Sequence, residues 1–134
     1  MTRWRDDDRG SVSLLLVVIV AALFVSVGLV VDGGAKLRAV QQATAAAGEA
    51  ARAATQQVDA GTVQLDGRAR LNPVTARHAA QETLDAAGVT GTVTVTDGQV
   101  HVDASVTRPA LFLGLVGLTQ VTGHGSATAD LTVD

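Results

Sequence analysis

Residues 11–31 form an uninterrupted apolar run that a short soluble chain has no means of burying. The run contains no charge, proline or amide side chain, and fifteen of its residues are Val, Leu, Ile or Phe. As a helix rising about 1.5 Å per residue, it reaches roughly 31 Å, close to the thickness of a bilayer hydrocarbon core. The run therefore predicts one membrane-spanning helix.

Two other interpretations of the run are weaker. A buried core helix needs bulky side chains around it, whereas the 134 residues include two Phe, one Trp and no Tyr. The apolar region of a cleaved secretory signal is usually about 7 to 15 residues long and is followed by a small-x-small site. Ala43-Thr44-Ala45 has that pattern but lies twelve residues beyond the run.

The flanking charges predict the orientation of the span. Arg3, Arg5 and Arg9 precede it, and Lys36 and Arg38 follow it, so the basic count of three against two favours a cytoplasmic N-terminus. We expect a cytoplasmic leader (1–10), a transmembrane helix (11–31), an Ala-rich helix (32–58) and a small extracytoplasmic α+β domain (59–134). The predicted location is the cell membrane, with lipid as a partner.

Composition excludes some classes of function. The chain has no cysteine, which removes disulfides, thiolate metal sites and cysteine nucleophiles. After the apolar run, the sequence contains seven Lys or Arg and ten Asp or Glu, so a nucleic-acid-binding surface is not expected.

We expect the long N-terminal transmembrane helix to continue into the Ala-rich stretch, with a bend or a loosened turn at Asp32-Gly33-Gly34. In this stretch, apolar and small residues recur at spacings of three and four, which indicates a helix with a seam that another surface can approach closely. The members of this candidate packing seam are Leu37, Val40, Thr44, Ala47, Ala51, Ala54 and Val58.

The remaining sequence predicts a helix and three antiparallel strands. Residues 59–71 are rich in Gly, Asp and Arg and are expected to form a loop, after which Asn72-Pro73 should begin a helix that ends near Ala87 and Gly88. Alternating residues on both sides of Asp97-Gly98 predict a hairpin, and residues 121–133 predict a third strand.

A short apolar tract lies between the second and third predicted strands and is too short to span a bilayer. We considered a helical turn that covers the core, a crossover loop that touches the membrane surface, and an exposed docking patch. The candidate patch residues are Leu111, Phe112, Leu113, Leu115, Val116 and Leu118.

The sequence offers little catalytic chemistry. His101 and His124 would share the polar face of the sheet near Asp103, which is a conceivable metal site, but no further ligand follows at a fixed spacing. We therefore interpret them as surface histidines, and we expect no enzyme activity, no cofactor and no metal.

The order of these features resembles the TadE/TadG-like family of tight-adherence (Flp-type) pilus assembly proteins. The resemblance lies in the leader ending Arg9-Gly10-Ser11, the apolar helix, Asp32-x-Gly34 and the Ala-rich tract from Gln41 to Ala54. Length favours the short TadE-like form. The resemblance implies a pilin-like fold and a non-catalytic role as a minor pilin or pseudopilin, with other pilin-like subunits and the assembly platform as partners.

The resemblance also implies a processing site. A prepilin peptidase, a further implied partner, can cut family members after a glycine before the apolar run, which corresponds here to the Gly10-Ser11 bond. The acidic residue that usually follows the cut is missing, because Ser13, Leu14, Leu15 and Leu16 are uncharged. The alternative function is a single-pass envelope protein, unrelated to pili, whose extracytoplasmic module binds a partner through the Leu111 to Leu118 patch.

Overall fold

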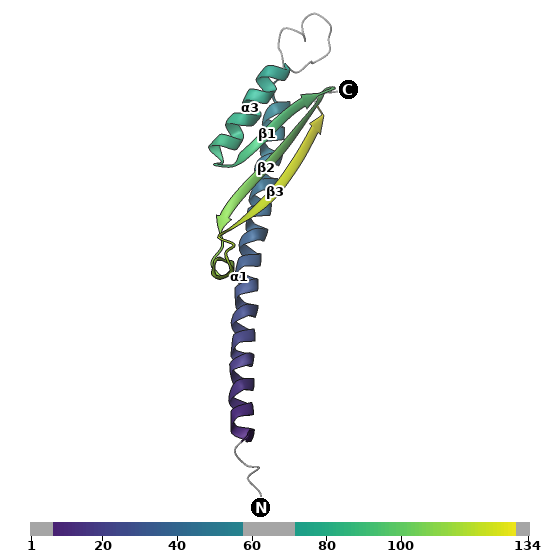
Figure 1. Ribbon diagram of the computed structural model, residues 1–134. Coiled ribbons are helices and arrows are strands. Elements are labelled where there is room, and N and C mark those ends of the chain that lie inside the picture. The colour runs from purple at the N-terminus through teal and green to yellow at the C-terminus, as the bar shows by residue number, and fades with distance from the viewer. Residues whose placement is uncertain (1–6, 58–71, 131–134) are drawn as a thin grey trace, which may run out of the picture.

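One long helix carries a small α+β unit on its C-terminal half (Figure 1). The computed structural model describes residues 7–57 and 72–130. Helix α1 (Asp7–Thr55) is followed by helix α3 (Pro73–Ala86), strands β1 (Thr90–Thr96) and β2 (Gln99–Pro109), the short 3₁₀ helix η1 (Leu113–Val116) and strand β3 (Gln120–Asp130). The predicted α+β, pilin-like layout is thus confirmed.

Helix α1 is continuous for 49 residues, so the apolar helix continues into the Ala-rich part as expected, and the bend or loosened turn expected at Asp32-Gly33-Gly34 does not interrupt it. Two glycines weaken a helix interior by about 0.5–1 kcal/mol each, which is why a loosened turn was expected. However, tertiary contacts lie on both sides of the glycines, since the loop after β2 bonds Asp32 and β3 packs on Ala39 and Val40. These contacts hold the helix straight through the weak point.

The start of α3 follows its sequence signal. Asn72 is the N-cap, and its side-chain Oδ1 accepts a hydrogen bond from the Val74 N–H at 3.0 Å, while Pro73 takes the first helical position. The helix ends before Gly88, which adopts a left-handed φ of +66°. The predicted loop at 59–71 and the seam residue Val58 lie outside the described residues.

The three strands form an antiparallel sheet in the order β1-β2-β3. Asp97 and Gly98 have φ of 50° and 78°, which gives the tight hairpin turn that the sequence predicted, and Thr96 pairs with Gln99 across it. This register places Val93, Val100 and Val102 on the buried face. Of the predicted third strand, residues 131–133 lie outside the described residues.

The core between α1, α3 and the sheet is built largely from alanine and valine, and Leu84, Val100 and Val102 are the largest fully buried side chains. Close packing is possible because β3 presents glycines to the helix. A Cβ at Gly123 or Gly125 would come within 3.0 Å of the α1 backbone at Val40 or Thr44. The strand therefore rests almost directly on the helix backbone.

Candidate functional site

The N-terminal half of α1 is apolar and uncovered. All fifteen large apolar residues between Val12 and Val31 are exposed, for example Leu23 at 62%, Phe24 at 67% and Val30 at 75%. Within the described residues, α1 is the one helix long and apolar enough to cross a membrane. This is consistent with a single-pass membrane anchor.

Asp32 lies one residue beyond this apolar segment and binds the loop that follows β2. Its Oδ1 accepts the Leu111 N–H at 2.9 Å, and its Oδ2 accepts the N–H groups of Phe112 at 3.0 Å and Leu113 at 2.6 Å. The side chain is 2% exposed. One carboxylate thus joins the end of the apolar helix segment to a loop about 80 residues further along the chain.

These hydrogen bonds favour the ionised carboxylate. The Leu113 N–H makes the largest contribution and lowers the pKa of Asp32; burial opposes it, and the N–H groups of Leu111 and Phe112 lower the pKa further. The net direction is a pKa below the ordinary value of an aspartate. Asp32 is therefore ionised at neutral pH and remains an acceptor for all three groups.

On the N-terminal side of Asp32, the loop packs on the apolar segment of α1 at Gly28. A Cβ at Gly28 would lie 2.8 Å from the Cβ of Phe112, so only glycine leaves room for this ring. Helix and loop together enclose an open apolar groove of about 410 Å³. It is lined by Phe24, Val25, Gly28 and Leu29 from α1 and by Phe112, Leu113, Leu115 and Val116 from the loop.

Further polar contacts fix the two ends of the loop. The Ala110 N–H donates to the Thr119 carbonyl at 2.9 Å and closes the loop at its base. Just before it, the Arg108 Nη2 donates to the Gln42 Oε1 on α1 at 2.7 Å. The loop is therefore attached to α1 at two levels, Gln42 and Asp32, which are ten residues apart on the helix.

The predicted docking patch coincides with this loop, but its residues divide into two groups. Phe112 and Leu113 are half-buried against α1. Leu111, Leu115, Val116 and Leu118 are 58–86% exposed. The tract is thus partly a contact to the chain's own helix and partly a free apolar surface.

The predicted packing seam is likewise divided. Ala47, Ala51 and Ala54 are buried under the chain's own sheet and α3. Leu37 is 59% exposed, Thr44 is exposed and Val40 is half-buried. Ala47, Ala51 and Ala54 therefore pack within this fold, and among the seam residues that the structure describes only the first three, Leu37, Val40 and Thr44, are accessible to another molecule.

The candidate cleavage pair, Gly10 and Ser11, lies in the first turns of α1 and is exposed. A Cβ at Gly10 would meet nothing within 4 Å. The bond is therefore sterically accessible, although a protease would need to unwind this end of the helix to bind it in an extended form.

The strand register separates the two histidines. His101 pairs with Thr128, whereas His124 pairs with Ser105, four residues along β2 from His101 and so about 13 Å away along the strand. The His101 Nε2 lies 3.2 Å from the Asp103 Oδ2, and its Nδ1 lies 2.8 Å from the Thr128 Oγ1. Among the described residues, no three potential ligands gather around a metal position.

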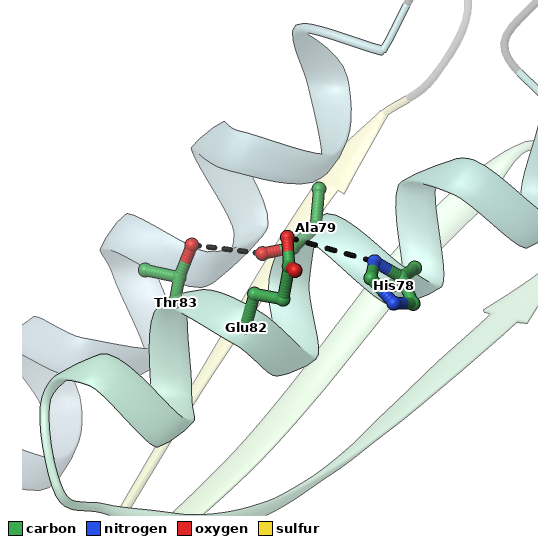
Figure 2. A network of polar contacts seen from close by, with 4 residues as sticks. All are labelled: His78, Ala79, Glu82 and Thr83. Carbon is green, nitrogen blue, oxygen red and sulfur yellow. Dashed lines mark hydrogen bonds and ion pairs between the residues drawn. The ribbon is translucent and has the colours of Figure 1, made fainter.

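The third histidine is also a surface residue. Figure 2 shows His78 and Glu82 on successive turns of α3. The His78 Nδ1 lies 3.5 Å from the Glu82 Oε2, and the Thr83 Oγ1 donates to the Ala79 carbonyl at 2.8 Å. Both partners of the pair are at least 70% exposed, so the interaction contributes little to stability.

Sequence reasoning missed Asp32 as a site residue. It treated this residue as the boundary of the apolar run and the start of a bend. The available signal was a single acidic residue directly after the span, together with an uncharged segment far away in the sequence. Neither feature alone specifies the pairing.

Comparison with known proteins gives one match. Residues 10–57 match the Tad family model, described as Flp pilus-assembly TadE/G-like. The matched segment covers the apolar half of α1, Asp32 and the Ala-rich half up to the end of the helix. No curated protein and no solved structure shows a significant match to the chain.

Proposed function

From the TadE/G-like Flp pilus-assembly domain at residues 10–57, we propose that this chain is a membrane-anchored, non-catalytic, pilin-like component of a tight-adherence pilus or a related secretion assembly. The observation that carries the proposal is the coincidence of this match with a helix that is bare and apolar in its first half and covered by a small α+β unit in its second.

The free surfaces support association with similar subunits within the membrane. The apolar half of α1 is uncovered on every side except at Gly28, where Phe112 lies. Helices in lipid associate through van der Waals packing rather than through the hydrophobic effect, and small residues help them approach. Ala21, Ala22 and Ser26 are exposed small residues in the middle of this segment.

Site-specific photocross-linking in native membranes tests the proposal. A photoreactive amino acid replaces Leu23, in the middle of the bare segment, and Thr94, on the outer face of β1, serves as the matched position outside it. We expect the probe at Leu23 to yield adducts with pilin-like subunits or with membrane proteins of the pilus assembly platform. Adducts exclusively with unrelated envelope proteins would favour the single-pass binding module instead.

Processing is a separate part of the proposal. We propose that the chain is cut at the Gly10-Ser11 bond, which leaves Ser11 as the N-terminus of the mature protein. Intact-mass measurement of protein from native membranes should find a chain that lacks ten residues, and Gly10→Val should retain them. A native chain of full length would show that the protein remains an uncleaved anchor.

A further inference from the structure

We propose that the loop between β2 and β3, residues 110–119, is a second membrane contact, whose exposed apolar side chains insert between the acyl chains of the leaflet nearest the α+β unit. The inference rests on the membrane anchoring in the proposed function. It adds a lipid-binding surface that is distant in sequence from the span and fixes the depth of the whole molecule in the bilayer.

The position of the loop along α1 is the first observation. Phe112 packs at Gly28, four residues before Asp32, and the groove extends to Phe24, eight residues before it. At 1.5 Å per residue, the loop side chains therefore reach about 6–12 Å from Asp32 into the apolar segment. Interfacial membrane elements bury their apolar faces to a similar depth of about 5–10 Å.

The composition of the loop is the second observation. Residues 110–119 contain no charged side chain, and Leu111, Leu115 and Val116 are 70%, 86% and 75% exposed. This surface is continuous with the bare apolar segment of α1 through the groove that the two share. If the segment of α1 lies in lipid, the same medium extends over the loop.

The hydrogen bonding of the loop backbone is the third and decisive observation. Irregular backbone enters lipid only when its polar groups are satisfied internally, because each unsatisfied group costs several kcal/mol there. Seven of the ten N–H groups of the loop are bonded in this way: those of Leu111, Phe112 and Leu113 bond to Asp32, and those of Ala110, Leu115, Gly117 and Leu118 bond to carbonyls within the loop. Asp32 thus supplies acceptors where the loop has none.

Lipid explains these features better than a second protein copy. A protein partner would account for the exposed apolar side chains but would not require the backbone donors to be matched internally, since its own polar groups and trapped water can satisfy them. The loop has no charged side chain and lies beside the end of the predicted span. Both features favour contact with acyl chains.

Depth-dependent quenching in vesicles tests the inference. The full chain, with Trp4→Phe to remove the native tryptophan, is reconstituted into phosphatidylcholine vesicles whose acyl chains carry bromine near the headgroup end. Single tryptophans are introduced by Leu115→Trp in the loop, Leu16→Trp in the span and Thr94→Trp on the outer face of β1. All three native side chains are exposed, so substitution disturbs little packing.

We expect quenching and a blue-shifted emission for Leu115→Trp, and neither for Thr94→Trp. In vesicles brominated near the middle of the acyl chains, quenching of Leu16→Trp shows that the span lies in the bilayer. Quenched Leu16→Trp with unquenched Leu115→Trp would overturn the loop contact alone, whereas loss of both signals would overturn the membrane anchoring. A blue-shifted but unquenched Leu115→Trp would assign the loop to a protein partner and would also overturn the inference.

Discussion

Asp32 is the residue on which the geometry of this molecule most depends, because its carboxylate joins the end of the apolar helix segment to the β2–β3 loop. Three backbone N–H groups need three acceptor positions, which an ionised carboxylate provides and an amide does not. A neutral replacement keeps the size of the side chain but loses part of this bonding. The loop should then separate from α1.

Acid should release the loop for the same reason. Hydrogen bonding lowers the pKa of Asp32 in the folded protein, so its stabilising contribution is fully present above the unfolded value of about 3.9 and is lost as the pH falls through the lower, folded value. Spin labels on cysteines introduced at Gln41 and Thr119 measure docking, because the chain has no native cysteine. We expect one narrow distance distribution at neutral pH and a broad one well below pH 4.

Residues 110–119 of the loop carry no titratable side chain, so Asp32 is the titratable group in this contact. The Asp32→Asn variant should therefore give the broad distribution at every pH, while Asp130→Asn, at an exposed aspartate, should behave like the native chain. A narrow distribution in Asp32→Asn at neutral pH would contradict the role assigned to the carboxylate.

Gly125 is a second residue with a testable structural role. A Cβ at this position would lie 2.6 Å from the Cα of Thr44, so Gly125→Ala must push β3 away from α1. Overpacking of this kind costs roughly 1–3 kcal/mol in free energy of unfolding. Thermal unfolding of the full chain in detergent micelles, followed by circular dichroism, should show a clear decrease in Tm.

The matched control for Gly125→Ala is Gly114→Ala, in η1. A Cβ at Gly114 meets nothing within 4 Å, and its φ is not positive. Its effect should stay within about 0.5 kcal/mol, as for ordinary surface substitutions. Equal losses for both variants would mean that the contact between β3 and the helix backbone is not what limits substitution at Gly125.

At the level of secondary-structure elements, α1 passes through Gly33 and Gly34 without a break, and neither position has a neighbour that would meet a Cβ. The double variant Gly33→Ala/Gly34→Ala should therefore raise the free energy of unfolding by about 0.5–1 kcal/mol per substitution. The same unfolding experiment measures this as a higher Tm. A decrease would show that the native helix needs conformational freedom at this point.

Local signals account for most elements, whereas tertiary contacts account for the features that the sequence did not reveal. The Asn72-Pro73 helix start and the Asp97-Gly98 hairpin turn depend on neighbouring residues alone, and both were predicted correctly. The role of Asp32 depends on a loop about 80 residues away. No periodicity within either segment encodes that pairing, so it required the folded structure.

The same reasoning explains the division of the Ala-rich seam. Its period predicts one close-packed face, but a period does not show whether the covering surface belongs to the same chain. Gly123 and Gly125 on β3 are the complementary feature, because they let a strand take the place that a second helix would otherwise occupy. Ala47, Ala51 and Ala54 are buried by this intramolecular packing.

For the whole molecule, the proposed function requires the leader and the α+β unit to lie on opposite sides of the membrane, with the leader in the cytoplasm. The basic residues that predict this orientation number three before the span and two after it, a small asymmetry, and acidic residues contribute little to orientation. The absence of cysteine allows a direct measurement with single introduced thiols.

In intact spheroplasts that produce the protein with Gly10→Val, which keeps the leader, a membrane-impermeant maleimide should label Thr94→Cys, on the exposed face of β1, but not Thr2→Cys, in the leader. Both should react after detergent solubilisation, which controls for buried thiols. Labelling of Thr2→Cys alone would reverse the orientation and would place the α+β unit in the cytoplasm, where it could not join an extracytoplasmic assembly. The lipid contact of the β2–β3 loop would survive that reversal, because it depends on the position of the loop along α1 and not on which leaflet surrounds it.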